Sequence, residues 1–443
     1  MTRMKESGID WIGQIPEEWR VRPIKHIVET PVTDGPHETP VLFDTGIPFL
    51  SAEAVKDGVL DFNYKRGYIS LKDHERFKKK ISPKKDDIFI VKSGATTGNV
   101  GIVNTEEIFD IWSPLALIRC NKTLAIQKYI YFYLLSTLFK SQVEFNWSFG
   151  TQQNIGMGVI ERIKVILPPV SEQQKIVEVL DKKTAQLDKV KSLLEEQIQK
   201  LKDYRASLIY ETVTKGLDKT ALMKDSGIDW IGQVPEGWGV NKLKFILEKG
   251  SNSIKVGPFG SSLSGDAIRS SGKWVYNQRN VLDNNFTETD FYISEAKCKE
   301  LKNFSVSSGD ILLTTRGTIG RVAIVPKKYC EGIIHPCLMK FKVDSKIVLP
   351  ELIKYLFNDI PLVREQLNFL SNSTTIDVIY SYNLKNIIIP TIPIEEQYSI
   401  LEVLDRQTSD VDSLIKIKQK QIENINKQRQ TLIYDYVTGK RRV

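Results

Sequence analysis

The sequence contains the same segment twice, and this internal repeat constrains the fold more than any other feature. Residues 4–29 read MKESGIDWIGQIPEEWRVRPIKHIVE and residues 223–248 read MKDSGIDWIGQVPEGWGVNKLKFILE, with 17 of 26 positions identical. A second pair, EQQKIVEVLDKKTAQLD from residue 172 and EQYSILEVLDRQTSDVD from residue 396, lies 224 positions apart. Both offsets are close to half of the 443 residues, so we interpret the chain as two tandem copies of one unit. The repeat is far longer than the ~20–50 residues of a solenoid.

The middles of the two copies, residues 30–150 and 249–373, align poorly. Because the ends are shared and the middles diverge, we expect the ends to have one common role. The middles would have the same kind of role, each toward a different target. The middles are predicted to be mixed α/β, because apolar β-rich runs alternate with turn signals. The predicted strands are 47–50, 87–92, 100–103, 310–315 and 321–325, and the predicted helices are 126–139 and 350–370.

The shared ends predict two long helices. Residues 172–215 and 395–438 contain no Gly or Pro, and a ~44-residue helix would be ~66 Å long. Ser171 and Gln174 form a capping-box signature, and Gly216 and Gly439 follow the predicted helix ends. Heptad spacing is regular in the first helix and looser in the second, where Lys418 interrupts the apolar seam. The predicted seam residues are Leu180, Leu187, Leu194, Leu201, Leu208, Leu404, Val411, Leu414, Ile425 and Leu432.

Such apolar stripes require a partner, and two of them in one chain can pair with each other. The heptads alone allow a parallel or an antiparallel pair. An antiparallel pair would hold two domains at opposite ends of a rod with approximate two-fold symmetry. The simpler interpretation is an intrachain rod, and the sharper one is that part of the stripe also docks helices of a partner.

Two glycine turns recur in the divergent middles. The segments 87–103 and 310–325 both read as strand, Gly-x-x-Gly-type turn, strand. Polar residues there could reach phosphates or bases, since Gln and Asn pair with adenine and Arg pairs with guanine. Plain hairpins, solvated charge runs and turn caps are the alternatives. The candidates for DNA contact, chosen by position and donor type, are His37, Lys79, Lys92, Ser93, Thr97, Asn99, Gln152, Gln153, Asn154, Lys255, Ser261, Arg279, Thr315, Arg316, Thr318, Arg321 and Thr374.

Composition narrows the class of protein. The net charge is +8 and the sequence pI is about 9.0, which fits a polyanion as partner. No P-loop and no G-x-S-x-G elbow is present, so neither ATP hydrolysis nor serine hydrolase chemistry is expected. No apolar run reaches the ~18–20 residues of a membrane span, and four cysteines without C-x-x-C spacing favour a cytoplasmic protein. Cys330, His335 and Cys337 lack a fourth zinc ligand and read better as buried thiols beside a histidine; no metal site is expected.

Taken together, these motifs resemble the specificity (S) subunits of type I restriction–modification systems. The resemblance lies in SGIDWIGQIPEEW at residues 7–19 and its second copy at 226–238, in P-x-x-E-Q before each long helix, and in the helix endings LIYETVTKG and LIYDYVTGK. The glycine turns, DGPH at residue 34 and GPFGSSL at residue 257 are similar to that family too.

The resemblance implies an α+β fold: two α/β target recognition domains separated by two long conserved helices, packed as an antiparallel coiled coil in a pseudo-two-fold tandem repeat. The expected divisions are 1–168 for the first recognition domain with its N-terminal segment, 169–219 for the first helical spacer, 220–392 for the second recognition domain and 393–443 for the second spacer.

The resemblance further implies a non-catalytic subunit that reads an asymmetric, bipartite double-stranded DNA target. It would bind two methyltransferase (M) subunits, with restriction (R) subunits joining that core, and no membrane. No cofactor is expected on this chain, whereas S-adenosylmethionine, ATP and Mg²⁺ are expected in the partners. The alternatives are a stand-alone sequence-specific DNA-binding protein, such as a repressor, and an enzyme of unknown type.

Overall fold

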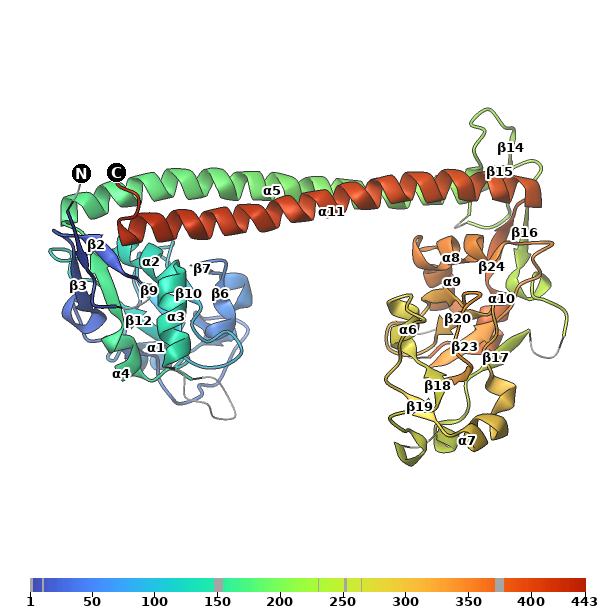
Figure 1. Ribbon diagram of the computed structural model, residues 1–443, viewed down its shortest axis with the longest axis horizontal. Coiled ribbons are helices and arrows are strands. Elements are labelled where there is room, and N and C mark those ends of the chain that lie inside the picture. Colours follow the sequence, from blue (N-terminus) through green and yellow to red (C-terminus); the bar gives the residue numbers. More distant parts are fainter. Residues whose placement is uncertain are drawn as a thin grey trace. The chain divides into compact units, whose positions relative to one another are not determined.

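The computed structural model describes residues 3–9, 12–146, 154–229, 231–250, 253–263, 265–370 and 378–443. The chain divides into two compact units (Figure 1). Unit 1 contains residues 1–195 and 419–443, and unit 2 contains residues 196–418. Each unit therefore combines one divergent middle with part of each long helix.

Unit 1 is built around a six-stranded sheet with the order β4-β12-β9-β10-β7-β6, beside a three-stranded sheet with the order β11-β5-β8. Two short pairs, β1-β2 and β13-β3, complete its strands. The strands are β1 (Met4–Glu6), β2 (Gln14–Pro16), β3 (Arg20–Pro23), β4 (Thr33–Asp34), β5 (Ile47–Leu50), β6 (Val55–Lys56), β7 (Val59–Leu60), β8 (Gly67–Ile69), β9 (Ile88–Val91), β10 (Val100–Ile102), β11 (Asp110–Ile111), β12 (Leu115–Ile118) and β13 (Lys164–Leu167).

The central strands are continuous apolar runs because both faces of the sheet are covered. Along β9, Ile88 and Ile90 join one core cluster with the helices, whereas Phe89 and Val91 join a second cluster on the other face. This alternation follows from the two-residue period of a strand. The helices of unit 1 outside the long pair are α1 (Leu71–Phe77), α2 (Gln127–Leu135), α3 (Thr137–Phe145) and α4 (Met157–Arg162).

Unit 2 repeats this plan with a smaller sheet of order β17-β23-β20-β21 and a three-stranded sheet of order β19-β18-β22. The pairs β14-β15 and β16-β24 match β1-β2 and β13-β3. Its strands are β14 (Met223–Asp225), β15 (Gln233–Pro235), β16 (Gly239–Lys242), β17 (Ile254–Val256), β18 (Lys273–Tyr276), β19 (Tyr292–Ile293), β20 (Ile311–Thr314), β21 (Val322–Ile324), β22 (Gly332–Ile334), β23 (Leu338–Phe341) and β24 (Ile388–Thr391). Its helices outside the long pair are α6 (Gln278–Leu282), α7 (Glu295–Glu300), α8 (Pro350–Asn358), α9 (Leu362–Leu370) and α10 (Ser381–Asn386).

Both helices predicted in the middles are interrupted, so those two predictions were wrong in their continuity. The segment 126–139 breaks at Ser136, whose backbone is extended and whose hydroxyl donates to the Tyr133 carbonyl at 2.6 Å. A serine hydroxyl competes in this way with the helix ladder. The segment 350–370 breaks before Pro361, which has no N–H to continue α8 and directly precedes α9.

The two long helices are α5 (Val170–Lys215) and α11 (Ile394–Thr438). The predicted capping box at Ser171 does not form, because α5 begins one residue earlier and Gln174 donates to Glu178 at 3.3 Å. The Pro169 carbonyl instead accepts the first helical N–H groups, and the Pro393 carbonyl does the same for α11. The two helices therefore begin alike.

Within each unit α5 and α11 run antiparallel, as predicted. In unit 1, Glu172 pairs with Arg442 at 2.8 Å and Asp188 pairs with Arg429 at 3.4 Å. In unit 2, the Lys418 ammonium donates to Gln197 at 2.6 Å, and Arg205 lies 3.1 Å from Asp412. Residue numbers rise along α5 as they fall along α11 in both units. Lys418, which interrupts the apolar seam, thus bonds across the pair.

A duplicated contact joins each long helix to its unit. The Trp19 indole donates to Glu172 at 3.0 Å in unit 1, and the Trp238 indole donates to Glu396 at 2.8 Å in unit 2. Trp19 and Trp238 belong to the first repeated segment, and the glutamates belong to the P-x-x-E-Q motifs. The two repeated segments are therefore similar because they contact each other.

The glutamines of the same motifs are fully buried and use their whole amide group. Gln173 accepts from the Ile126 N–H at 2.8 Å and donates to two carbonyls, those of Leu124 and Pro168. Gln397 accepts from the Leu349 N–H at 2.8 Å and donates to the carbonyls of Ile347 and Ile392. Each glutamine thus ties its long helix to the loop that starts α2 or α8.

Candidate nucleic-acid interface

The repeated glycine turns join two neighbouring antiparallel strands in each unit, as predicted. β9 pairs antiparallel with β10, and β20 pairs antiparallel with β21. The Gly98 N–H donates to the Val91 carbonyl at 2.8 Å, and the Gly320 N–H donates to the Thr314 carbonyl at 2.9 Å. Glycines at the start and end of both turns have positive φ, between 66° and 102°, which favours glycine.

In unit 1 a buried aspartate gathers the cations near the turn. Asp34 is buried and binds Lys92, Lys80 at 2.7 Å and His37 at 3.2 Å. Burial alone would raise the pKa of Asp34, but the hydrogen bonds from Lys80 and Lys92 outweigh burial and lower it. Lys92 is itself buried, so this predicted DNA contact holds an internal ion pair, whereas the His37 side chain is 74% exposed.

The basic run of residues 76–85, which begins in the last turn of α1, is largely neutralised by acidic neighbours. Arg76 pairs with Glu38 and Asp73, Lys78 pairs with Glu75, and Lys85 pairs with Glu106. Lys79 is exposed, and no ion pair joins it to another described residue. Lys84 is likewise exposed without an ion pair to another described residue, so Lys79 and Lys84 are the members of this run that are available to a phosphate.

The remaining candidates of unit 1 surround the turn on two sides. Ser93 is half-buried and forms a bridge with Asn154, which is exposed. The Thr97 hydroxyl donates to the Gly94 carbonyl at 2.7 Å and closes the turn. Asn99 lines an open cavity of about 480 Å³ together with Asp188 and other residues of the long helices, so it faces them. Gln152 and Gln153 lie outside the described residues.

Among the candidates of unit 2, Lys255 lies on β17, Ser261 lies on the segment that follows β17, and Thr315 and Thr318 lie between β20 and β21. Lys255 is half-buried with its ammonium 5.5 Å from the Phe304 ring centre, whereas Ser261 is exposed. Thr315 is buried and donates to the Cys337 carbonyl at 2.9 Å, so it supports the turn. Thr318 is exposed on the turn, and its carbonyl accepts from Gln278 at 3.3 Å. Thr374 lies outside the described residues.

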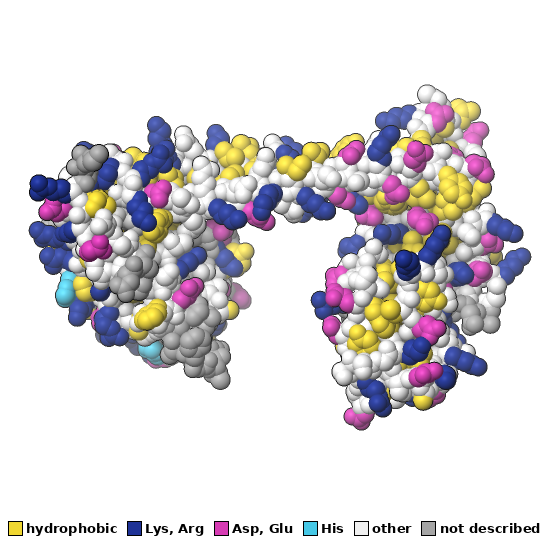
Figure 2. All heavy atoms as spheres, in the orientation of Figure 1, with side chains coloured by type: hydrophobic (Ala, Val, Ile, Leu, Met, Phe, Trp, Pro, Cys, Tyr) yellow, Lys and Arg dark blue, Asp and Glu magenta, His cyan; other side chains and the backbone are white. Residues whose placement is uncertain are grey.

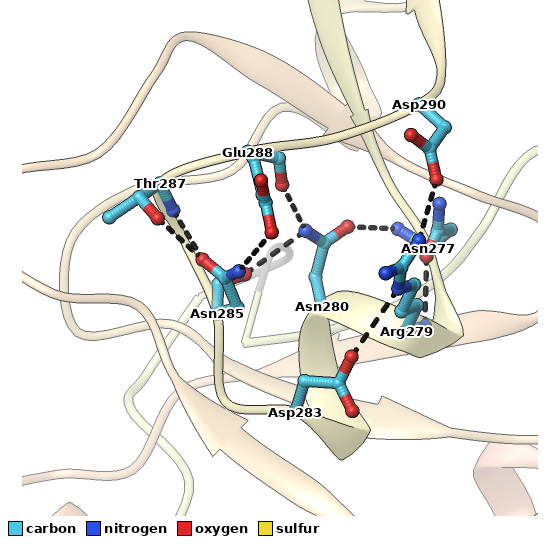
Figure 3. A network of polar contacts seen from close by, with 8 residues as sticks. All are labelled: Asn277, Arg279, Asn280, Asp283, Asn285, Thr287, Glu288 and Asp290. Atoms are coloured by element: carbon cyan, nitrogen blue, oxygen red, sulfur yellow. Dashed lines mark hydrogen bonds and ion pairs between the residues drawn. The ribbon is translucent and has the colours of Figure 1, made fainter. Parts of the chain in front are cut away.

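The three arginine candidates of unit 2 differ in what they bind. Arg279 is exposed on α6 but lies 2.9 Å from Asp290 and 3.4 Å from Asp283 (Figure 3). Arg321 donates to the Asn358 carbonyl at the end of α8. Arg316 is exposed at the start of the turn, and no hydrogen bond or ion pair joins it to a residue that the structure describes.

Two side-chain pairs of unit 1, one with an aromatic ring and one with a buried acid, were not predicted from the sequence. The Arg66 guanidinium lies 4.4 Å from the ring centre of Trp112, whose indole N–H is buried and finds no partner among the described residues. Asp110 lies 2.6 Å from His74, and burial raises the pKa of Asp110 in spite of that bond. These pairs join residues 36 or more positions apart, so no local pattern announces them.

His335 and Cys337 of unit 2 lie next to each other. His335 lies 3.0 Å from the Cys337 sulfur, and burial raises the pKa of that thiol. Within the described ranges, no group of three or more His, Cys, Asp or Glu side chains is placed to hold a metal ion.

The predicted seam residues differ in burial along the helices. Leu180, Leu404 and Val411 are buried, whereas Leu414 is 46% exposed. The others are half-buried, namely Leu187, Leu194, Leu201, Leu208, Ile425 and Leu432.

Hydrophobic side chains are exposed at equivalent positions of the two helices. Val190 and Leu193 on α5 are 47% and 48% exposed, and Leu414 and Ile417 on α11 are 46% and 56% exposed. The offset of 224 residues relates the two pairs, so they are the same surface in duplicate. Figure 2 shows hydrophobic side chains between charged ones along the helices. No described helix is long and apolar enough to cross a bilayer.

Comparison with known proteins finds one family. The family model described as "Type I restriction modification DNA specificity domain" matches residues 16–202 and again residues 235–427. The chain is 28% identical to a putative type I restriction enzyme MjaX specificity subunit of Methanocaldococcus jannaschii, over 98% of this chain and 96% of that protein. It is 24% identical to the MjaVIII specificity subunit of the same organism, over 97% and 94%.

A solved structure, from work on complex assembly and conformational transition of the type I R-M system, has the same fold. Its TM-score is 0.68 over 96% of this chain and 99% of that chain, at 14% identity. At that level of identity the likeness concerns the fold alone.

Proposed function

The chain belongs to the type I restriction–modification DNA specificity family, and from this premise we propose that it reads a split, asymmetric DNA target for partner enzymes. The observation that carries this proposal is that a frame of contacts at the start of each long helix is duplicated, whereas the surfaces of the two glycine turns differ. The Trp–Glu and Gln contacts recur in both units, whereas Ser93 of one turn corresponds to Arg316 of the other. One domain would read each half-site, so the halves should differ.

The recognition domains carry the half-site contacts in this proposal, and the division at 168, 219 and 392 stays our working boundary. The exposed candidates Lys79, Asn154, Ser261, Arg316 and Thr318 support backbone and base contacts. Buried Lys92 and Thr315 support the turns from within.

Chemistry lies in the partners under this proposal. Two M subunits would supply S-adenosylmethionine and adenine methylation, and R subunits would supply ATP- and Mg²⁺-dependent cleavage, while this chain binds no cofactor. A cytoplasmic location fits this role and is supported by the four cysteines, all of which are free.

The duplicated exposed pairs favour a scaffold over a stand-alone DNA-binding protein. A protein without partners would keep the outer surface of its helices polar. Val190 with Leu193, and Leu414 with Ile417, instead offer the same apolar surface twice. Two copies of one partner would cover two equivalent surfaces, which agrees with two M subunits.

Co-expression with the neighbouring M subunit tests the proposal. We expect a complex of two M subunits and one copy of this chain by mass measurement, and a split methylated motif by methylome sequencing. Leu193→Ser and Ile417→Ser should each weaken the binding of one M subunit about 10-fold, because each removes apolar area that the M subunit would bury. Leu222→Ser, at a 73% exposed leucine outside the long helices, is the matched control. A monomeric chain and an unmethylated genome would refute the proposal.

A further inference from the structure

Arg316 stands on a fixed section of backbone. It lies two residues after the end of β20, and the residue before it, Thr315, donates to the Cys337 carbonyl with both its N–H and its hydroxyl at 2.9 Å. The residue after it, Gly317, has φ of +66°, and a Cβ there would lie 3.3 Å from the Gln278 amide. The backbone on both sides of Arg316 is therefore held in place.

Helix α6 supports the turn from the side. Asn277 caps α6 by accepting from the Arg279 N–H at 2.8 Å, and buried Asn280 accepts from the Asn277 N–H at 2.9 Å (Figure 3). The Asn280 amide also donates to the carbonyls of Asn285 and Glu288. This network fixes Gln278, the first residue of α6, whose amide donates to the Thr318 carbonyl of the turn at 3.3 Å.

The guanidinium of Arg316 remains available while its neighbours are engaged. Arg279 is held by Asp283 and Asp290, and Arg321 is held by the Asn358 carbonyl. Arg316 is exposed and makes no such contact within the described part of the chain. Burial and then the charge of Arg316 lower the pKa of His335.

An arginine on a rigid support, whose guanidinium binds no residue that the structure describes, suits a planar pair of acceptors. Guanine presents such a pair, O6 and N7, in the major groove. Resting on the proposed function, we propose that Arg316 reads a guanine in the half-site recognised by unit 2. The equivalent residue of unit 1 is Ser93, whose side chain is too short for this contact. This arginine contact is therefore specific to one half-site.

Methylome sequencing of cells carrying the M complex tests the assignment. Exchange of residues 30–150 should leave one half-site unchanged, and this is the half-site that unit 2 reads. Arg316→Ala should relax one guanine position in that half-site, and should leave the other half-site and the gap between the half-sites unchanged. Arg279→Ala, which removes an exposed arginine of unit 2 that Asp283 and Asp290 engage, should leave the motif unchanged. An unaltered motif in Arg316→Ala, or relaxation in the other half-site, would overturn the inference.

Binding by the purified wild-type complex gives a second test that does not depend on the alanine variant. Replacing the assigned guanine by 7-deazaguanine removes N7 and should weaken binding by the wild type about 10-fold. Arg316→Lys keeps the charge but not the fork, so it should lose the same discrimination. Equal binding of guanine and 7-deazaguanine by the wild type would indicate a phosphate contact and refute the inference. Failure of the proposed function is distinguishable, because then the wild-type complex would methylate no split motif.

Discussion

The two units share their frame and differ in their turn surfaces. In both, a tryptophan binds the glutamate, and a buried glutamine binds a loop, at the start of a long helix. Both also place a glycine where a side chain would meet backbone: a Cβ at Gly35 or Gly257 would lie 2.3 Å from a carbonyl oxygen. The frame is repeated because each of these contacts leaves little choice of residue.

The difference lies in what surrounds the turns. Unit 1 adds the β6-β7 strands beside β10, whereas in unit 2 the side chain of Asn358 pairs with both backbone groups of Val322 on edge strand β21. Unit 1 neutralises Lys92 with Asp34, whereas unit 2 has Val256 in the place of Asp34. Recognition surfaces thus vary where the frame tolerates different side chains.

The strongest test of this comparison exchanges the whole divergent middle of unit 1. Replacing residues 30–150 by the matching part of a relative should change one half-site completely and leave the other unchanged, because that segment carries the turn of unit 1 alone and Gln173 binds only backbone groups within it. Methylome sequencing of the hybrid would measure this outcome. A change in both half-sites would show that the domains do not read independently.

The frame itself can be tested at its glutamines. Gln173→Ala and Gln397→Ala each leave a buried N–H and two carbonyls without partners, so each should cost its own unit about 2–4 kcal/mol. Hydrogen exchange should increase at the Ile126 amide in the first variant and at the Leu349 amide in the second. Gln174→Ala, at an exposed position of α5, should change neither. Effects of very different size would show that the two frames are not equivalent.

The repeat, the long helices and the central strands could be predicted because their signals are local or periodic. The Gly turns followed from spacing between apolar runs in the same way. The state of Lys92 could not be predicted, since its partner Asp34 lies 58 positions away. Ser136 and Pro361 interrupted predicted helices because side-chain and ring chemistry outweighed apolar periodicity. Among the arginines, only the structure distinguishes Arg316 from Arg279 and Arg321.

The ion cluster around Asp34 in unit 1 provides a pH test at a position where unit 2 has Val256. Asp34→Asn leaves buried Lys92 without its carboxylate and should cost unit 1 about 3 kcal/mol at pH 7. The pKa of Asp34 is lowered in the folded state, so its stabilisation is present above about pH 4 and is lost as pH falls through the folded value. Denaturant unfolding followed by hydrogen exchange from pH 7 to pH 3 should therefore show convergence of variant and wild type at low pH. Asp44→Asn, at an exposed aspartate of unit 1, should behave as wild type.

The smallest expected difference concerns the equivalent arginines of the long helices. Arg205 pairs with Asp412 at 3.1 Å and also with Asp359 at 2.5 Å, whereas among described carboxylates Arg429 pairs with Asp188 alone. Partly exposed ion pairs contribute modestly, so Arg205→Met should cost about 1 kcal/mol and Arg429→Met about half of that. Double-mutant cycles with Asp359→Asn should assign the excess to the second pair. Equal losses of stability in the two variants would mean that the Arg205–Asp359 pair at the end of α8 adds no stability. The long helices would then be joined to each recognition domain with the same strength.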